Sequence, residues 1–155
     1  AGCGSAGAYP ELEARIPSSL FGAAPTALDS GRNCSAANLG SLAKHGIREV
    51  RFAGGRWDRS RTSGLTLAVF AGEGLTAERL GEWYEASARA TNKTAGLRPS
   101  RPTIDGRQGY RLDLLASEVP QTVICWPSAD GTLVQVVLAA GVPEADISAG
   151  IAAFP

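Results

Sequence analysis

The sequence contains no methionine and a single histidine, and its fifteen basic side chains are balanced by fifteen acidic ones. A chain without net charge has no general electrostatic attraction to nucleic acid or to an anionic membrane surface, so we expect neither partner. No apolar run approaches the roughly 20 residues that a membrane-spanning helix requires. From the missing methionine we expect that the natural start was removed before Ala1, by processing or by the choice of fragment.

Several motifs that carry chemistry are also missing. The sequence has no GxSxG and no GxxxxGK[ST], and it has neither a CxxC pair nor paired histidines. We therefore expect no metal and no cofactor. His45 is the only candidate base for a serine or cysteine nucleophile, and Cys34 begins a predicted helix where its pKa could be lowered. A small hydrolase or thiol enzyme that uses Cys34, or a serine, with His45 is the alternative function.

The length of 155 residues is typical of one domain. A chain of this size buries about 70% of its unfolded surface, which is enough for one hydrophobic core. Small residues dominate the first positions, and such a composition is typical of a flexible linker. The sequence thus predicts an N-terminal tether over residues 1–8 and a single globular domain over residues 9–155.

Cys3 lies in the opening segment AGCGS, among small residues. This segment resembles the end of a bacterial lipobox, in which an export signal is cut just before a cysteine that then carries acyl chains. The resemblance covers three residues, and the flanking GSAGA suits a tether. It implies an exported protein that is either anchored at the bacterial cell membrane or secreted. A lipid on Cys3 would be its only link to a membrane.

Hydrophobic periodicity and turn residues predict the secondary structure. The most regular pattern is a helix over 76–92, in which Leu80, Trp83 and Tyr84 share one face. The turn at Asp105-Gly106 predicts a hairpin over 101–116. Other helices are expected over 9–16, 34–46 and 143–154. Other strands are expected over 26–28, 47–57, 65–71, 121–127 and 132–140, with a turn or bulge at Gly54-Gly55.

Consecutive strands joined by short turns must pair antiparallel, and segregated helices indicate an α+β fold. We expect an antiparallel sheet of about five to six strands, with the long helix and the C-terminal helix packed on it. The segment LGEWYEASARA, followed by the hairpin IDGRQGYRL, two strands and a last helix, resembles the order of elements in the PsbP-like fold. This resemblance covers about 90 residues. It implies a binding or accessory role without catalysis.

If Cys3 carries a lipid, the two other cysteines are left as a pair. Cys34 is expected at the start of a helix and Cys125 in the middle of a strand. The sequence therefore predicts a Cys34–Cys125 disulfide in an oxidising compartment. In the chain-entropy model, closing that loop stabilises the fold by roughly 4 kcal/mol. The other possibility is three reduced, buried thiols in a cytosolic protein.

The stretch RFAGGRWDRSRTSG holds the most distinctive surface candidate. Arg and Trp are enriched at binding hot spots. An anionic envelope polymer or an envelope protein is the predicted partner, and a solvated loop with internal ion pairs is the alternative. The candidate binding residues are Arg51, Arg56, Trp57, Arg59 and Arg61.

Together these patterns predict an exported, lipid-anchored bacterial envelope domain that acts as a non-catalytic binding or accessory module. A purely structural envelope protein is a further possibility. No residue pattern identifies the ligand.

Overall fold

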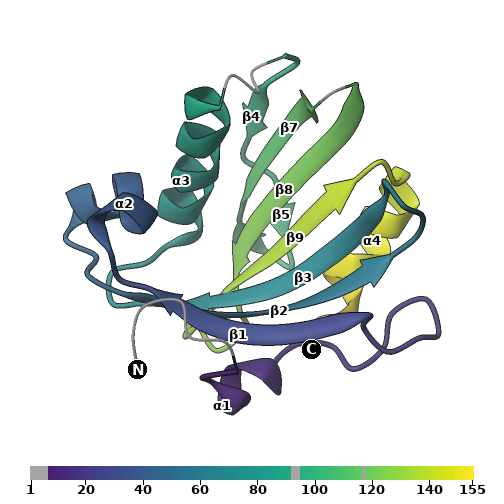
Figure 1. The fold of residues 1–155 in the computed structure, drawn as a ribbon, viewed down its shortest axis with the longest axis horizontal. Helices are drawn as coiled ribbons and strands as arrows, with labels where there is room; N and C mark the ends of the chain where they lie inside the picture. The colour runs from purple at the N-terminus through teal and green to yellow at the C-terminus, as the bar shows by residue number, and fades with distance from the viewer. Residues whose placement is uncertain (1–6, 92–94, 117) are drawn as a thin grey trace.

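In the computed structural model, which describes residues 7–91, 95–116 and 118–155, one large sheet carries helices on both faces (Figure 1). All its neighbouring strands are antiparallel, in the order β1-β2-β3-β9-β8-β7-β4. The predicted α+β class is therefore confirmed, with seven strands in place of five or six. The strands are β1 (Ala27–Asn33), β2 (Val50–Asp58), β3 (Gly64–Ala71), β4 (Arg98–Ser100), β7 (Tyr110–Ala116), β8 (Val119–Pro127) and β9 (Val134–Ala140).

The helices divide between the two faces of this sheet. The long helix α3 (Ala77–Ala90) lies on one face against β7 and β8, beside the short α2 (Ala36–Leu39) and the 3-10 helix η1 (Gly40–His45). The C-terminal helix α4 (Glu144–Ala153) packs on β3 and β9 from the other face. The short α1 (Pro10–Glu13) contacts β1 and β2. The sheet separates two hydrophobic clusters, one on each side.

Strand alternation assigns each side chain to one of these faces. Asp29, Gly54, Ala68, Val136 and Cys125 lie opposite one another across five strands, on the side of α3. We call this side the α3 face. The next row belongs to the opposite side, which we call the α4 face, because its central members pack in the cluster that contains Ile147 of α4. That row consists of Leu28, Gly55, Leu67, Val137, Ile124 and Arg111.

Local signals account for the best-predicted elements. Thr76 caps α3, because its side chain accepts a hydrogen bond from the Arg79 N–H at 3.1 Å. Asp105 and Gly106 both have positive φ, as a two-residue hairpin turn requires, and they join β5 (Thr103–Ile104) to β6 (Arg107–Gln108). The predicted helix over 34–46 is instead divided, because Gly40 adopts φ 48° and ψ −121° between α2 and η1.

The first strand is longer than expected because its turn-forming residues find distant partners. Asp29 and Ser30 are typical of turns. Here the Ser30 hydroxyl donates to Glu13 at 2.6 Å and accepts from the Tyr9 N–H at 2.9 Å. The Asp29 carboxylate accepts the Gly7 N–H at 2.8 Å. Tertiary contacts therefore override the local preference, and β1 runs through to Asn33.

Helix α3 approaches the sheet most closely at Gly81. A Cβ added there would lie 2.2 Å from ring carbons of Tyr110, a distance that no real contact allows. The Tyr110 hydroxyl donates to Glu85, one turn further along the same helix. Arg101 lies over the same ring at 4.3 Å and forms two hydrogen bonds with Glu78 of α3. Tyr110 thus determines how near α3 lies to β7.

We expect Gly81→Ala to destabilise the fold, although alanine is the better helix former by about 1 kcal/mol. Overpacking of a core costs typically about 1–3 kcal/mol, because the ring or the helix must move. Gly54→Ala is the control, since its Cβ would meet Thr66 and Ala68 at an ordinary 3.7–3.8 Å. Urea unfolding of both variants measures the difference. Equal stabilities of the two variants would contradict this account of the helix–sheet contact.

Helix α4 is held at its N-terminal end by a charged cluster on the α4 face. Arg111 of β7 binds Asp113 at 3.0 Å and Glu144 at 2.7 Å, and Thr122 donates to Asp113 at 2.8 Å. Burial acts to raise the pKa of Asp113, but the hydrogen bonds from Arg111 and Thr122 outweigh it and lower that pKa. The hydrogen bond from Arg111 also lowers the pKa of Glu144. Both carboxylates therefore favour the folded state when they are ionised.

Arg111→Gln should cost about 1–3 kcal/mol at neutral pH, the usual range for hydrogen bonds to charged groups. The lowered pKa values mean that this stabilisation is present above the unfolded-state pKa and is lost as the pH falls through the folded-state pKa. The wild type should therefore lose more stability than the variant on acidification. Thermal unfolding at several acidic and neutral pH values measures this difference.

Arg56→Gln provides the control, because Arg56 and Asp58 form the same i,i+2 pair on β2 with both side chains more than 40% exposed. Such exposed pairs contribute about 0–1 kcal/mol. The role assigned to Arg111 is wrong if both substitutions cost the same.

Candidate functional site

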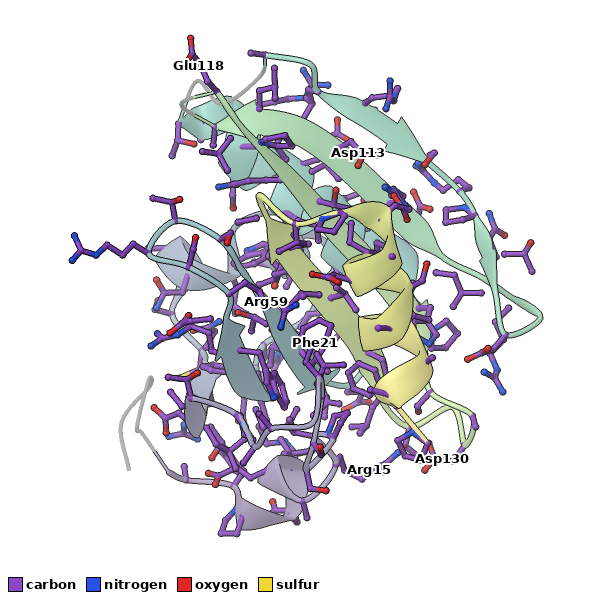
Figure 2. The ribbon with its side chains drawn as sticks, turned by 90° about the vertical axis from the view of Figure 1, so that its right-hand side faces the viewer. Arg15, Phe21, Arg59, Asp113, Glu118 and Asp130 are labelled. Carbon is purple, nitrogen blue, oxygen red and sulfur yellow. The ribbon has the colours of Figure 1, made fainter. Side chains whose placement is uncertain are left out.

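The five residues predicted as one binding surface lie on different sides of the sheet. Strand alternation directs Arg56 to the α3 face, and Arg51 and Trp57 to the α4 face. Arg51 lies over the Tyr9 ring at 5.8 Å. Arg59 lies over the Phe21 ring at 4.0 Å and 3.5 Å from Asp146, on the side of α4 (Figure 2). The structure therefore does not bring this group together.

Trp57 is a core residue and cannot bind a partner at the surface. Only 3% of it is exposed, and its indole N–H donates to the Ala23 carbonyl at 2.9 Å. The prediction for Trp57 is thus wrong, because strand alternation points this ring into the core while its neighbour Arg56 points to the other face of β2. Arg61 is exposed in the β2–β3 loop. Within the described ranges no acidic side chain forms an ion pair with it.

The predicted Cys34–Cys125 disulfide is not formed. Cys125 is a free thiol, fully buried in β8, and burial raises its pKa far above the ordinary range. Cys34 directly follows β1, which is separated from β8 by β2, β3 and β9. Four strand spacings of about 4.8 Å give roughly 19 Å along the sheet, whereas bonded cysteines have Cα atoms about 4.4–6.8 Å apart.

Cys34 is nevertheless disulfide-bonded. It therefore offers no thiolate for catalysis. Cys3, the predicted lipid site, lies outside the described residues, as does most of the predicted tether. Lipidation of Cys3 stays a prediction.

His45 lies at the end of η1 and faces α3. Its Nε2 is 3.6 Å from a carboxylate oxygen of Glu82. Across the part of the chain that the structure describes, no serine hydroxyl hydrogen-bonds to His45. The alternative hydrolase thus has no assembled nucleophile and base in these residues.

A different site opens on the α3 face, where α3 leaves part of the sheet uncovered. Two hollows of about 430 and 320 Å³ lie there, and they share four lining residues, Arg56, Thr66, Tyr84 and Leu138. The larger hollow reaches the β2–β3 loop at Ser60–Ser63. The smaller reaches the edge strand β1 at Asp29. We call the two hollows together the α3-face groove.

Small side chains form the floor of this groove. Gly54, Thr66 and Ala68 occupy neighbouring positions on β2 and β3. At Gly55, on the opposite face, an added Cβ would lie 2.9 Å from Ile16, so packing requires glycine there. At Gly54 the added atom would make only ordinary contacts. A glycine weakens a strand interior, and it often marks close approach of a ligand.

Tyr84 is an aromatic residue of the groove that carries a polar group. It projects from α3, lines both hollows and packs edge-on against Phe70. Burial raises the pKa of its hydroxyl, so the group stays protonated. No described residue hydrogen-bonds to this hydroxyl. It can therefore donate a hydrogen bond to a ligand in the groove.

Charged side chains lie around the rim of the groove. Arg56 and Asp58 form an exposed ion pair at 3.1 Å, and Arg61 lines the same hollow. At the other end, Asp29 accepts hydrogen bonds from the N–H groups of Gly7 and Ser30. The arginines are therefore concentrated at the end near the β2–β3 loop.

Two further hollows are less suited to a specific ligand. One of about 650 Å³ is lined by charged side chains of both signs, namely Arg48, Arg51, Glu49 and Glu73. Another of about 510 Å³ lies at the start of α3, where Glu78 already binds Arg101. Neither is lined by a tyrosine hydroxyl, whereas the α3-face groove is lined by that of Tyr84.

Sequence reasoning identified Arg56 and Arg61 but missed the groove. The pair Gly54-Gly55 indicated a turn or bulge, whereas both residues continue β2. Tyr84 was placed correctly on the apolar face of α3. The signal that could have revealed the groove is Gly54, a glycine inside a strand, because such a glycine often marks a site where a ligand approaches the backbone.

The chain matches no protein-family model, no curated protein and no solved structure. Among the described residues, no helix has the length and apolar character needed to cross a membrane. The site must therefore be interpreted from its own chemistry.

The states of the cysteines can be checked by alkylation and peptide mapping. We expect Cys125 to react only after unfolding, because it is buried, and Cys34 to react only after reduction. Native and urea-unfolded samples, each with and without reductant, separate these cases by mass. Alkylation of Cys34 without reductant would contradict the disulfide.

The same map identifies the partner of Cys34. In a chain with three cysteines, of which Cys125 is free, an intrachain partner is Cys3. A Cys3 that forms this bond has no sulfur left for a lipid. Mapping therefore decides between a second bonded cysteine and an acylated one.

Proposed function

We propose that this protein is an exported, non-catalytic binding module of a bacterial cell envelope, and that its ligand is a small, mainly apolar molecule held in the α3-face groove. The observation that carries the proposal is the Tyr84 hydroxyl. Tyr84 lines both hollows, and its hydroxyl has no hydrogen-bond partner among the described residues. Ligand sites are usually apolar hollows of about 300–1,000 Å³ with a few placed polar groups.

Two observations support export. Cys34 is disulfide-bonded, and disulfides persist in oxidising compartments outside the cytosol. The opening segment AGCGS resembles a lipobox. An acyl chain on Cys3 would add a membrane link, but ligand binding in the groove does not depend on it.

The absence of an assembled catalytic group in the described residues is consistent with a binding role. The PsbP-like order of elements also favours it, since proteins of that fold are mostly binding or accessory proteins. An envelope protein or anionic polymer remains a possible further partner. It would have to contact Arg56 and Arg61 without Trp57, because that ring is buried.

N-phenyl-1-naphthylamine, an uncharged dye that fluoresces in apolar sites, tests the proposal directly. We expect saturable fluorescence on titration of the folded protein. Gly54→Leu should weaken this binding at least tenfold, because the added side chain extends from the floor into the groove. Fluorescence titration gives the affinity, and circular dichroism shows whether the variant is folded.

Ala86→Leu is the matched control, because Ala86 is exposed on α3 and lines neither hollow. It adds the same apolar side chain outside the groove and should leave dye affinity unchanged. Equal affinities of wild type and a folded Gly54→Leu variant would exclude the groove. No dye binding by the wild type would remove the proposed function itself.

A further inference from the structure

The α3-face groove differs in chemistry along its length. The end at the edge strand is lined by Phe52, Ala68 and Phe70, together with Gly54 of the floor. The end at the β2–β3 loop is lined by Arg56, Arg61 and several hydroxyl-bearing side chains. A ligand that matches both ends must be apolar over most of its length and polar at one end.

Several features at the polar end favour a negatively charged group. Arg61 forms no ion pair with any described acidic residue. The pair between Arg56 and Asp58 is exposed, with 57% and 45% of the side chains accessible, so an incoming anion can compete for Arg56. Ser60 and Ser63, which bond to each other at 2.7 Å, add hydroxyl donors beside the arginines. Of the described residues that line this hollow, Asp58 alone is acidic.

The middle of the groove adds a second recognition element. Tyr84 lines both hollows, so a chain that runs from one to the other passes its ring and hydroxyl. Leu138 and Thr66 lie beneath that passage on β9 and β3. The hydroxyl can donate to an ester or carboxyl oxygen near the polar end of such a chain.

We infer that the ligand is a single-chain amphiphile with an anionic head, whose apolar chain lies along β2 and β3 while Arg61 and Arg56 bind the head. This inference rests on the proposed function and specifies its ligand class. The head can be the carboxylate of a fatty acid or the phosphate of a lysophospholipid, and both suit guanidinium donors.

Isothermal titration calorimetry of the folded protein with four ligands of equal chain length tests the inference. The ligands are dodecanoate, 1-lauroyl-lysophosphatidate, dodecanol and dodecyltrimethylammonium, each below its micelle-forming concentration. We expect the two anionic ligands to bind at least tenfold more tightly than dodecanol, and the cationic one to bind most weakly. The ratio of the first two affinities distinguishes a carboxylate ligand from a phosphate ligand.

Three variants locate the interactions. Arg61→Gln should weaken the anionic ligands about tenfold and leave dodecanol unchanged. Arg48→Gln is the control, because Arg48 is an exposed arginine that lines a separate hollow. Tyr84→Phe should weaken the anionic ligands several-fold while the packing against Phe70 is kept.

The outcomes separate this inference from the proposed function. If dodecanol binds as tightly as dodecanoate and Gly54→Leu abolishes both, the groove is a ligand site but the anionic head is wrong. Equal effects of Arg61→Gln and Arg48→Gln also overturn the assigned head site. If no ligand binds and the protein is a dimer that Gly54→Leu dissociates, a second copy fills the groove, and both proposals fail.

Discussion

The contact between Gly81 and the Tyr110 ring determines how α3 lies on the sheet. The helix backbone can reach the ring only because residue 81 has no side chain. The hydroxyl of the same ring binds Glu85, so the helix is held at two successive turns. With α3 fixed against β7 and β8, its Tyr84 extends toward β3 and β9 without covering them. The groove is the uncovered part of the sheet that results.

Room in the groove depends on a second set of small residues. Gly54, Ala68 and Thr66 form the floor where larger side chains on a strand would fill the space. The two glycines of β2 thus have different roles, although they are adjacent. Gly55 lets Ile16 pack on the α4 face, whereas nothing in the packing around Gly54 requires a glycine. Gly54 weakens the strand and no packing contact requires it, and a residue of that kind is expected at a binding site.

Much of the fold could be predicted from local patterns. Thr76 as a helix cap, the apolar face of α3 and the Asp105-Gly106 turn all act within a few residues, so the sequence displays them directly. The prediction failed where distant contacts override local preference. Asp29 and Ser30 join a strand because α1 and the preceding chain supply their hydrogen-bond partners. The predicted pairing of Cys34 with Cys125 failed because spacing along the chain carries no information about separation across a sheet.

By itself the sequence determined the α+β class, the long helix with its cap and the single-domain length, since these follow from composition, periodicity and nearest neighbours. It also placed Arg56 and Arg61 among the candidate residues. Only the tertiary structure decided which of the arginines share a face, which cysteine is bonded, and that Tyr84 and Gly54 meet in one groove. Strand alternation and strand order control those outcomes. Both depend on which strands pair, and such pairing joins residues far apart in the chain.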